Sequence, residues 1–155
     1  EVANDNAKGQ IIVSGDKISV NLFSSKLREL KVKTIPLKVS APFHCTLMKP
    51  AADVMREKIK NINFNTPDKK IINNVTADEE KNSEKIKDLL VQQIYSSVKW
   101  RDSLINMSKN GVENFVDIGP GKVLSGMVKR TIKNVNCFSI NSIADIKNLI
   151  NEFKK

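Results

Sequence analysis

The chain has 155 residues, of which 40% are hydrophobic and 28% charged, and its 26 basic and 17 acidic residues give a formal net charge of +9. This length suits one domain or part of one, with enough apolar side chains for a core. No apolar run reaches the ~18 residues of a membrane span, and no signal peptide is evident. Two cysteines and one histidine exclude a disulfide framework and a histidine-based metal site. We therefore expect a soluble globular protein without structural zinc.

Lysine carries almost all of the positive charge, with 22 Lys against 4 Arg. Excess basic charge attracts nucleic acid, anionic lipid or acidic proteins. Bidentate phosphate recognition favours arginine, and stacking on single strands needs exposed aromatic side chains, of which the chain has few. A general drift in base composition, an acidic partner and nucleic acid all stay open as explanations, in that order.

The first part of the chain is predicted to form a strand, a helix and a strand. Residues 11–13 are β-branched and apolar and are followed by a turn at Ser-Gly. Asp16 is placed to cap a helix whose apolar stripe extends to Leu30. Residues 34–39 are predicted to be extended, and Pro36 favours the edge of a sheet for this segment.

The rest of the chain alternates between helical and extended patterns. Pro50 is tolerated only in a first helical turn, which places that helix start near residue 46. In chain order, the patterns predict a helix at 46–61, a strand at 70–73, a surface loop at 76–85, helices from Ser83 and at 100–110, a strand at 114–118, a helix at 123–132, a strand at 135–140 and a helix after Ser142 with Ile146, Leu149 and Ile150 inward. This alternation predicts an α/β fold with largely parallel strands.

His44 is the only imidazole in the chain, so histidine acid–base chemistry near neutral pH has to use it. It follows a predicted strand and immediately precedes the helix predicted from residue 46. Side chains at the carboxyl ends of strands face the ligand crevice in α/β sheets. This position favours a functional role, whereas a lone histidine without such a setting is more often structural.

A histidine that acts as a general base needs its second ring nitrogen held by an acceptor. No carboxylate stands out for this role. The helix from Ser83 is predicted to end close to Gln93, where main-chain carbonyls lack intrahelical partners. Either the amide of Gln93 or its main-chain carbonyl could orient His44, and a core glutamine satisfied by backbone groups is the structural alternative.

No nucleophile is evident, since the chain contains no G-x-S-x-G sequence. Cys45 is expected to be a small buried thiol, because neighbouring side chains diverge and it cannot readily pair with His44. Residues 119–122, Gly-Pro-Gly-Lys, lack the glycine and hydroxyl of a phosphate loop at the places of Val116 and Val123. A tight structural turn is predicted there, with anion binding as the alternative.

Several motifs occur in a fixed order. They are Asn4-Asp5-Asn6 with Gly9-Gln10, Val39-Ser40-Ala41-Pro42-Phe43-His44-Cys45, Leu47-Met48-Lys49-Pro50-Ala51, Ile72-Asn73-Asn74-Val75, Gln93-Ile94-Tyr95 with Val98 and Trp100, and Gly119-Pro120-Gly121-Lys122-Val123-Leu124. In order, spacing and residue type, this set closely resembles the carboxyl-terminal half of the bacterial malonyl-CoA:acyl carrier protein transacylases. The resemblance covers essentially the whole chain and is more discriminating than any single motif.

The resemblance implies transfer of a malonyl group from coenzyme A to the phosphopantetheine thiol of acyl carrier protein through an acyl-serine intermediate. It implies that His44 is the base that activates the serine and later the thiol, and that the main-chain carbonyl of Gln93 holds this histidine. Asn4 matches an active-site asparagine near the bound acyl group. Phe43 matches a position where an aromatic side chain resembles the malonyl-selective pattern of related acyltransferases.

The implied fold is α/β. Residues 1–38 correspond to part of a ferredoxin-like small subdomain, and residues 39–155 to the carboxyl-terminal part of an α/β-hydrolase-like acyltransferase subdomain. The family's serine elbow, the arginine for the malonyl carboxylate and the glutamine of the oxyanion hole lie upstream of the matched region. Because acyl transfer needs nucleophile, base and oxyanion donors together, we expect a fragment that carries the base and is inactive alone.

The resemblance further implies acyl carrier protein and malonyl-CoA as partners, and neither nucleic acid nor a membrane. The substrates bring coenzyme A and phosphopantetheine, so we expect no resident cofactor and no metal. A cytoplasmic location is implied, and a monomer at full length. A candidate docking patch for the acidic carrier protein consists of Lys122, Lys129, Arg130 and Lys133, with a solvated lysine-rich face as the alternative.

Two other hypotheses stay open. A basic binding module for nucleic acid or acidic protein would explain the net charge. A related acyltransferase that acts on a different acyl-CoA is the other alternative, and a Phe43→Ser change that fails to broaden acyl selectivity would contradict the interpretation of Phe43.

Overall fold

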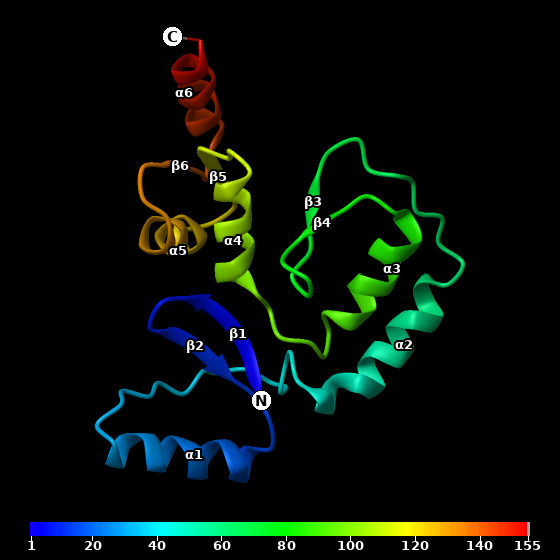
Figure 1. Ribbon diagram of the computed structural model, residues 1–155, viewed down its shortest axis with the longest axis vertical. Coiled ribbons are helices and arrows are strands. Elements are labelled where there is room, and N and C mark those ends of the chain that lie inside the picture. Colours follow the sequence, from blue (N-terminus) through cyan, green and yellow to red (C-terminus); the bar gives the residue numbers. More distant parts are fainter. Residues whose placement is uncertain (155) are drawn as a thin grey trace.

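Three groups of elements follow one another along the chain and occupy separate regions of the molecule (Figure 1). The computed structural model describes residues 1–154. The first group is β1 (Val2–Ala7), β2 (Gln10–Val13) and α1 (Lys17–Glu29); the second is η1 (Thr46–Met48), α2 (Lys49–Ile59), β3 (Ile71–Ile72), β4 (Glu79–Glu80) and α3 (Ser83–Gln92); the third is α4 (Trp100–Lys109), β5 (Asn114–Ile118), α5 (Val123–Thr131), β6 (Asn136–Ile140) and α6 (Ile143–Phe153).

The first group is a hairpin followed by a helix. β1 and β2 pair antiparallel around a tight turn in which Gly9 has φ +76°. Asp16 caps α1 by accepting hydrogen bonds from two main-chain N–H groups, which confirms the predicted helix start. The predicted strand at 34–39 is wrong, because residues 32–39 follow an irregular path without strand pairing. Pro36 in this segment has no N–H to donate to a ladder.

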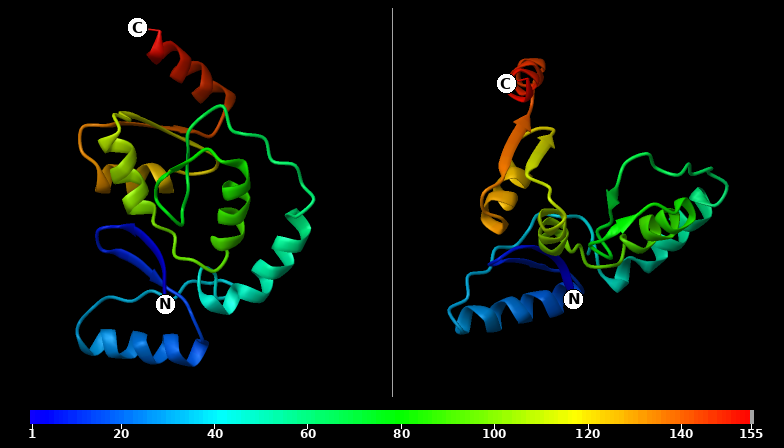
Figure 2. Two further views of the ribbon diagram at one scale, coloured as in Figure 1. Left: turned by 45° about the vertical axis from the view of Figure 1, so that its right-hand side comes forward. Right: turned by 45° about the horizontal axis from the view of Figure 1, so that its top comes forward.

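The second group is built on the packing of α2 against α3, which lie alongside each other in every view (Figure 2). Their buried contact residues are Ala52, Ile59 and Val91. Pro50 stands in the first turn of α2, as predicted. The helix start predicted at Ser83 is correct to one residue, since the side chain of Asn82 is the cap. The segment predicted as a surface loop at 76–85 contains the short strand β4.

The third group contains a parallel strand pair. Among the three strand pairs within residues 1–154, β5–β6 is parallel and the other two are antiparallel. The prediction of largely parallel strands is therefore right for β5–β6 and wrong for β1–β2 and β3–β4, because a short hairpin connection can join only antiparallel strands. α4 packs against β1 and α5 and so connects the third group to the first. Arg101 of α4 also pairs with Asp5 of β1.

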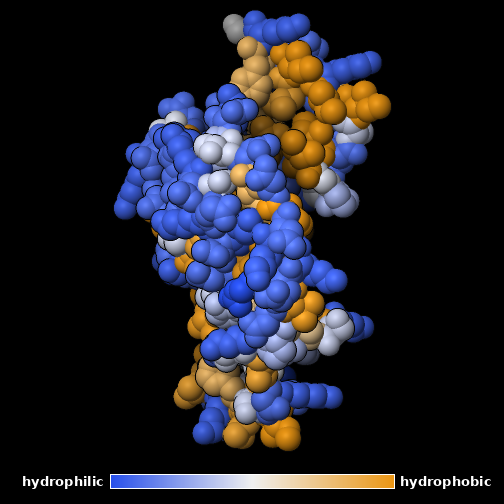
Figure 3. All heavy atoms as spheres, turned by 90° about the vertical axis from the view of Figure 1, so that its right-hand side faces the viewer, coloured by the Kyte–Doolittle hydropathy of each residue, from blue (hydrophilic) through white to orange (hydrophobic). Residues whose placement is uncertain are grey.

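Two helices present apolar faces to the surface. None of the described side chains of α1 or α6 is buried, and Ile18 of α1 is 79% exposed. Ile146 and Ile150 of α6, predicted to point inward, are 45% and 47% exposed. Apolar surface gathers at the end of the molecule that carries α6 and again at the opposite end (Figure 3). Contiguous apolar surface of this kind marks places where other protein surfaces pack.

No helix within residues 1–154 has the length and hydropathy of a membrane span.

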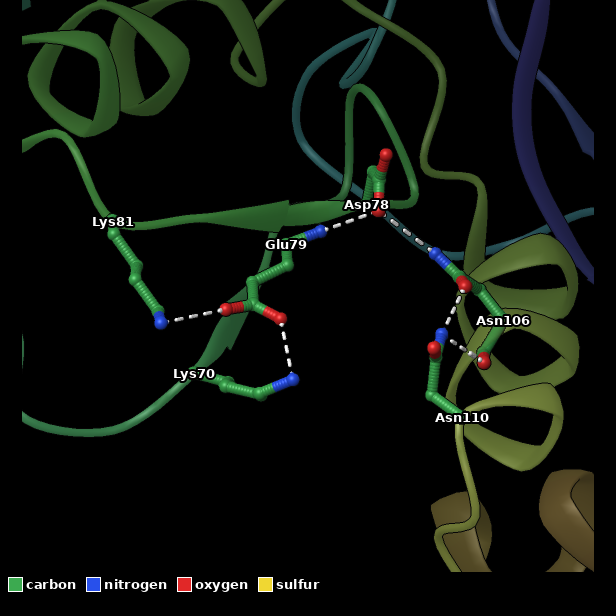
Figure 4. Close-up of polar contacts among 6 residues, drawn as sticks. All are labelled: Lys70, Asp78, Glu79, Lys81, Asn106 and Asn110. Carbon is green, nitrogen blue, oxygen red and sulfur yellow. Dashed lines mark hydrogen bonds and ion pairs between the residues drawn. The ribbon is translucent and has the colours of Figure 1, made fainter.

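Charged side chains fix the β3–β4 hairpin and its turn (Figure 4). Glu79 pairs with Lys70 at 2.9 Å and with Lys81 at 3.3 Å. Asp78 accepts hydrogen bonds from its neighbour's N–H at 2.8 Å and from the amide of Asn106 on α4 at 3.1 Å. The hydrogen bond from Lys70 lowers the pKa of Glu79, and the bond from the main-chain N–H of Glu79, followed by that from Asn106, lowers the pKa of Asp78.

This network predicts acid sensitivity. A carboxylate whose folded pKa is depressed adds stability above its unfolded pKa, and this stability is lost as the pH falls through the folded value. We expect thermal stability to fall from about pH 5 to pH 3, and to fall less in Asp78→Asn, which cannot titrate at this position. The melting temperatures of the parent and of Asp78→Asn, measured by circular dichroism at several pH values, test this prediction. Asp53→Asn, an exposed carboxylate outside the network, is the control, and equal slopes in both variants would contradict the prediction.

Candidate active site

His44 lies two residues before the start of η1, beside the carboxyl end of α3. Its ring Nδ1 is 2.8 Å from the main-chain oxygen of Gln93. Its own main-chain N–H donates to the carbonyl of Ile94 at 3.3 Å. Two successive carbonyls after α3 therefore hold both the side chain and the backbone of this residue. The prediction that a helix-end carbonyl could orient His44 is confirmed, with the main-chain group of Gln93 as the acceptor.

The packing of α2 on α3 explains why these groups meet. The buried cluster between the two helices extends to Ile94 and Tyr95, which directly follow Gln93. η1 and α2 begin just after His44, so the same contact places the start of one helix next to the end of the other. The last carbonyls of a helix lack intrahelical partners, which leaves them available to an outside donor.

The acceptor fixes the chemistry of the ring. A carbonyl oxygen can only accept a hydrogen bond, so Nδ1 carries the proton in the neutral imidazole. Nε2 then holds a free lone pair and can remove a proton from a hydroxyl or thiol. This arrangement allows an imidazole to act as a general base, with its tautomer set by the neighbouring carbonyl.

The backbone at His44 is in the left-handed region, with φ +59°. This conformation costs a non-glycine residue about 1–2 kcal/mol and persists only where neighbouring contacts impose it. Next to it, Cys45 is fully buried and its thiol donates to the carbonyl of Pro42 at 3.1 Å, which confirms the predicted buried thiol.

The carboxylate of Glu1 holds the next residue along the chain. It accepts hydrogen bonds from the hydroxyl and the main-chain N–H of Thr46, which begins η1. These hydrogen bonds lower the pKa of Glu1, the hydroxyl bond first. The start of the chain is thereby attached to the turn that follows His44.

Phe43 and Asn4, the two residues predicted to contact the substrate, differ in how they lie relative to His44 and Gln93. Phe43 is adjacent to His44 in sequence and is 46% exposed. Asn4 lies on β1 and forms a parallel bridge with Val98, a few residues beyond Gln93. The hydrogen bonds that join His44 to α3 do not include Asn4, so the structure leaves the predicted substrate roles of Asn4 and Phe43 as predictions.

The residues of the predicted docking patch are exposed, but Arg130 differs from the three lysines in its contacts with the rest of the fold. Lys122 precedes α5, Lys129 and Arg130 form its last turn, and Lys133 follows it. The guanidinium of Arg130 donates to the side chain of Gln10 on β2 and to a carbonyl of its own helix. Arg130 therefore connects α5 to the β1–β2 hairpin, in addition to any contact with a partner.

The Gly119–Gly121 segment forms a turn with positive φ at both glycines. The N–H of Gly119 donates to the carbonyl of Ile140 at 3.0 Å, and the N–H of Gly121 donates to the side chain of Asn141 at 2.7 Å. These contacts fit the predicted structural turn.

Asn74 belongs to the motif at residues 72–75, but the sequence assigns no role to this residue. Its amide donates to the side-chain oxygen of Gln93 at 3.3 Å. The available signal was its place in an Asn-Asn pair at the end of the strand predicted at 70–73, where ligand-facing residues occur in α/β folds.

The fold is that of the α/β acyltransferases. The structure matches an acyl-carrier-protein S-malonyltransferase from Bartonella henselae with a TM-score of 0.94 and 35% identity, over 100% of this chain and 50% of that chain. The sequence profile of the acyl transferase domain matches residues 1–152. The chain belongs to the acyl transferase domain family.

Named relatives place this chain more closely within that family. A malonyl CoA-acyl carrier protein transacylase from Bacillus subtilis is 38% identical over 156 residues, which cover 100% of this chain and 49% of the relative. A malonyl-transacylase solved in complex with a type II PKS acyl-carrier protein matches with a TM-score of 0.93 and 33% identity, over 98% of this chain and 50% of that chain. The chain thus spans about half the length of the curated relatives it matches.

Proposed function

We propose that the protein to which this chain belongs transfers a malonyl group from malonyl-CoA to an acyl carrier protein, with His44 as the general base. The observation that carries this proposal is the hydrogen bond between Nδ1 of His44 and the carbonyl of Gln93, which leaves Nε2 free to accept a proton. The names of the relatives supply the substrate class.

The proposed reaction uses Nε2 of His44 twice. It takes the proton of the attacking hydroxyl as that oxygen adds to the thioester carbonyl, and gives the proton to the departing thiolate of coenzyme A. In the second half-reaction it takes the proton of the phosphopantetheine thiol and returns it to the hydroxyl oxygen. The intervening imidazolium lies at the carboxyl end of α3, where the helix dipole is negative and stabilises positive charge.

The nucleophile is outside the 155 residues in this proposal. In the family that the chain resembles it is a serine in a G-x-S-x-G sequence, and that sequence does not occur here. The malonyl-binding arginine and the oxyanion-hole glutamine are assigned to the same missing part. The base alone cannot transfer an acyl group, so the chain is expected to need the complementary half for activity.

The remaining assignments are part of the same proposal. Phe43, next to the base, restricts bulk near the acyl group and favours malonyl over branched substrates. Asn4 lies near the bound acyl group. The exposed lysines at 122, 129 and 133 attract an acidic carrier protein. No resident cofactor is required, because coenzyme A and phosphopantetheine, which carry the acyl group as thioesters, belong to the substrates. We assign the reaction to the cytoplasm.

A chimera tests the proposal. In it, this chain replaces the segment of the Bacillus subtilis relative that it matches over 156 residues. We expect the chimera to transfer malonyl from malonyl-CoA to phosphopantetheinylated acyl carrier protein, and to use methylmalonyl-CoA poorly. The remaining half of the relative, expressed alone, is the background control. A chimera that melts cooperatively and transfers no malonyl above this background would refute the proposed function.

A further inference from the structure

Asn74 lies in the turn between β3 and β4 and contacts the segment that follows α3 at two points. Its side-chain amide donates to the side-chain oxygen of Gln93 at 3.3 Å. Its main-chain carbonyl accepts a hydrogen bond from the N–H of Lys99 at 3.0 Å. Both partners lie on the stretch that leads from the end of α3 to the start of α4. Asn74 therefore holds this stretch from one side.

The turn that carries Asn74 is itself firmly attached. Asn73 is buried, and its carbonyl accepts from the N–H of Ala77 at 2.8 Å while its own N–H donates to the carbonyl of Asp78 at 3.0 Å. The amide of Asn106 on α4 donates to the carbonyl of Ala77 at 2.9 Å and also to the carboxylate of Asp78, as Figure 4 shows for the latter contact. The position of Asn74 is thus set by α4 and not by the turn alone.

The residue that Asn74 holds is the one that orients the base. Gln93 is the C-cap of α3, the part of a helix that frays most readily. Its carbonyl is the acceptor for Nδ1 of His44. The backbone of His44 is in the left-handed region and depends on outside contacts to remain there. Restricting Gln93 through its side chain therefore restricts the position of the acceptor.

We propose that Asn74 is a positioning residue for the general base, acting through the side chain of Gln93 to fix the carbonyl that sets the tautomer of His44. This inference rests on the proposed function of His44. Asn74 does not touch the reacting atoms; it maintains the distance and direction of the Gln93 carbonyl. Its loss lowers the fraction of His44 rings that present a free Nε2.

The test uses the chimera with Asn74→Ala and Asn74→Leu, the latter keeping the side-chain volume but not the hydrogen bond. We expect each variant to lower kcat by about threefold to tenfold, with KM for malonyl-CoA unchanged, because one hydrogen bond of ordinary strength is lost. Gln93→Ala is expected to give a similar loss, and the double variant no larger a loss, since both changes remove the same contact. Asn136→Ala is the matched control: it removes an amide–amide hydrogen bond to Asn114 on the β5–β6 pair.

A second readout does not depend on activity. Long-range proton–nitrogen NMR reports the tautomer of the neutral His44 ring, identified by the signal that disappears in His44→Asn. We expect a mainly Nδ1-protonated ring in the parent chimera and a mixture of tautomers in Asn74→Ala and Asn74→Leu. A parent chimera without transferase activity would refute the proposed function while this readout still tests Asn74. Unchanged kcat and tautomer in both Asn74 variants, or additive losses in the double variant, would overturn the role of Asn74.

Discussion

Replacing His44 by Asn in the chimera is expected to lower kcat/KM for malonyl transfer by about a thousandfold, the usual contribution of a positioned general base. Asn removes the base but tolerates the left-handed backbone that the structure gives this position. His44→Ala is expected to lose as much activity and also some thermal stability, because alanine pays the full cost of this conformation. Steady-state transfer assays and thermal melts separate the two effects.

The comparison between the two substitutions is the control for this prediction. Equal melting temperatures for the parent and His44→Asn would show that the lost activity is chemical in origin. Retention of more than about a tenth of the parental kcat/KM by His44→Asn would mean that another group takes the proton.

Truncation of Leu104 is expected to have the largest effect on stability. Leu104 is fully buried in α4, the helix that packs against both β1 and α5. Leu104→Ala removes buried apolar contacts and leaves a cavity, so we expect the free energy of unfolding to fall by about 2–5 kcal/mol. Urea denaturation of the chimera measures this change. Ile105→Ala, at the neighbouring position that is 37% exposed, is the matched control and is expected to cost less than half as much. Equal losses of unfolding free energy in Leu104→Ala and Ile105→Ala would contradict the importance of the buried face of α4 for stability.

Local signals predicted most of the regular elements. These signals are short-range: apolar residues at helical spacing, the caps at Asp16 and Ser142, and the proline in the first turn of α2. The structure agrees with each of them. β1 was not predicted, because its centre is the polar run Asn-Asp-Asn, which lacks the β-branched composition of a strand. Its pairing depends on β2 and on the bridge to Val98, which are contacts outside its own sequence.

The burial of the last helix shows a different limit. An apolar stripe along α6 states which face avoids water, but not which surface covers that face. Ile146 and Ile150 were assigned inward on the stripe alone and are half exposed. Hydrophobic periodicity predicts a helix with more certainty than it predicts a partner for its apolar face.

The candidate site was partly accessible from sequence. His44 was identified as the single imidazole before a helix, and helix-end geometry pointed to Gln93 as its acceptor. The resemblance to acyltransferases is confirmed by the family match over residues 1–152. Asn74 was missed because its partner is 19 residues away and the contact arises only when the β3–β4 turn packs beside the end of α3.

The group that orients His44 belongs to the peptide backbone, and every amino acid supplies the same carbonyl. A substitution of Gln93 therefore alters how firmly this carbonyl is held in position, but it does not remove the carbonyl. The tautomer of His44 therefore depends on the residue at which α3 ends, and many residues together determine where that helix ends. In an acyltransferase of this design, substitutions at position 93 are expected to lower activity severalfold, whereas mutations that extend or displace the helix remove the acceptor and are expected to inactivate the enzyme.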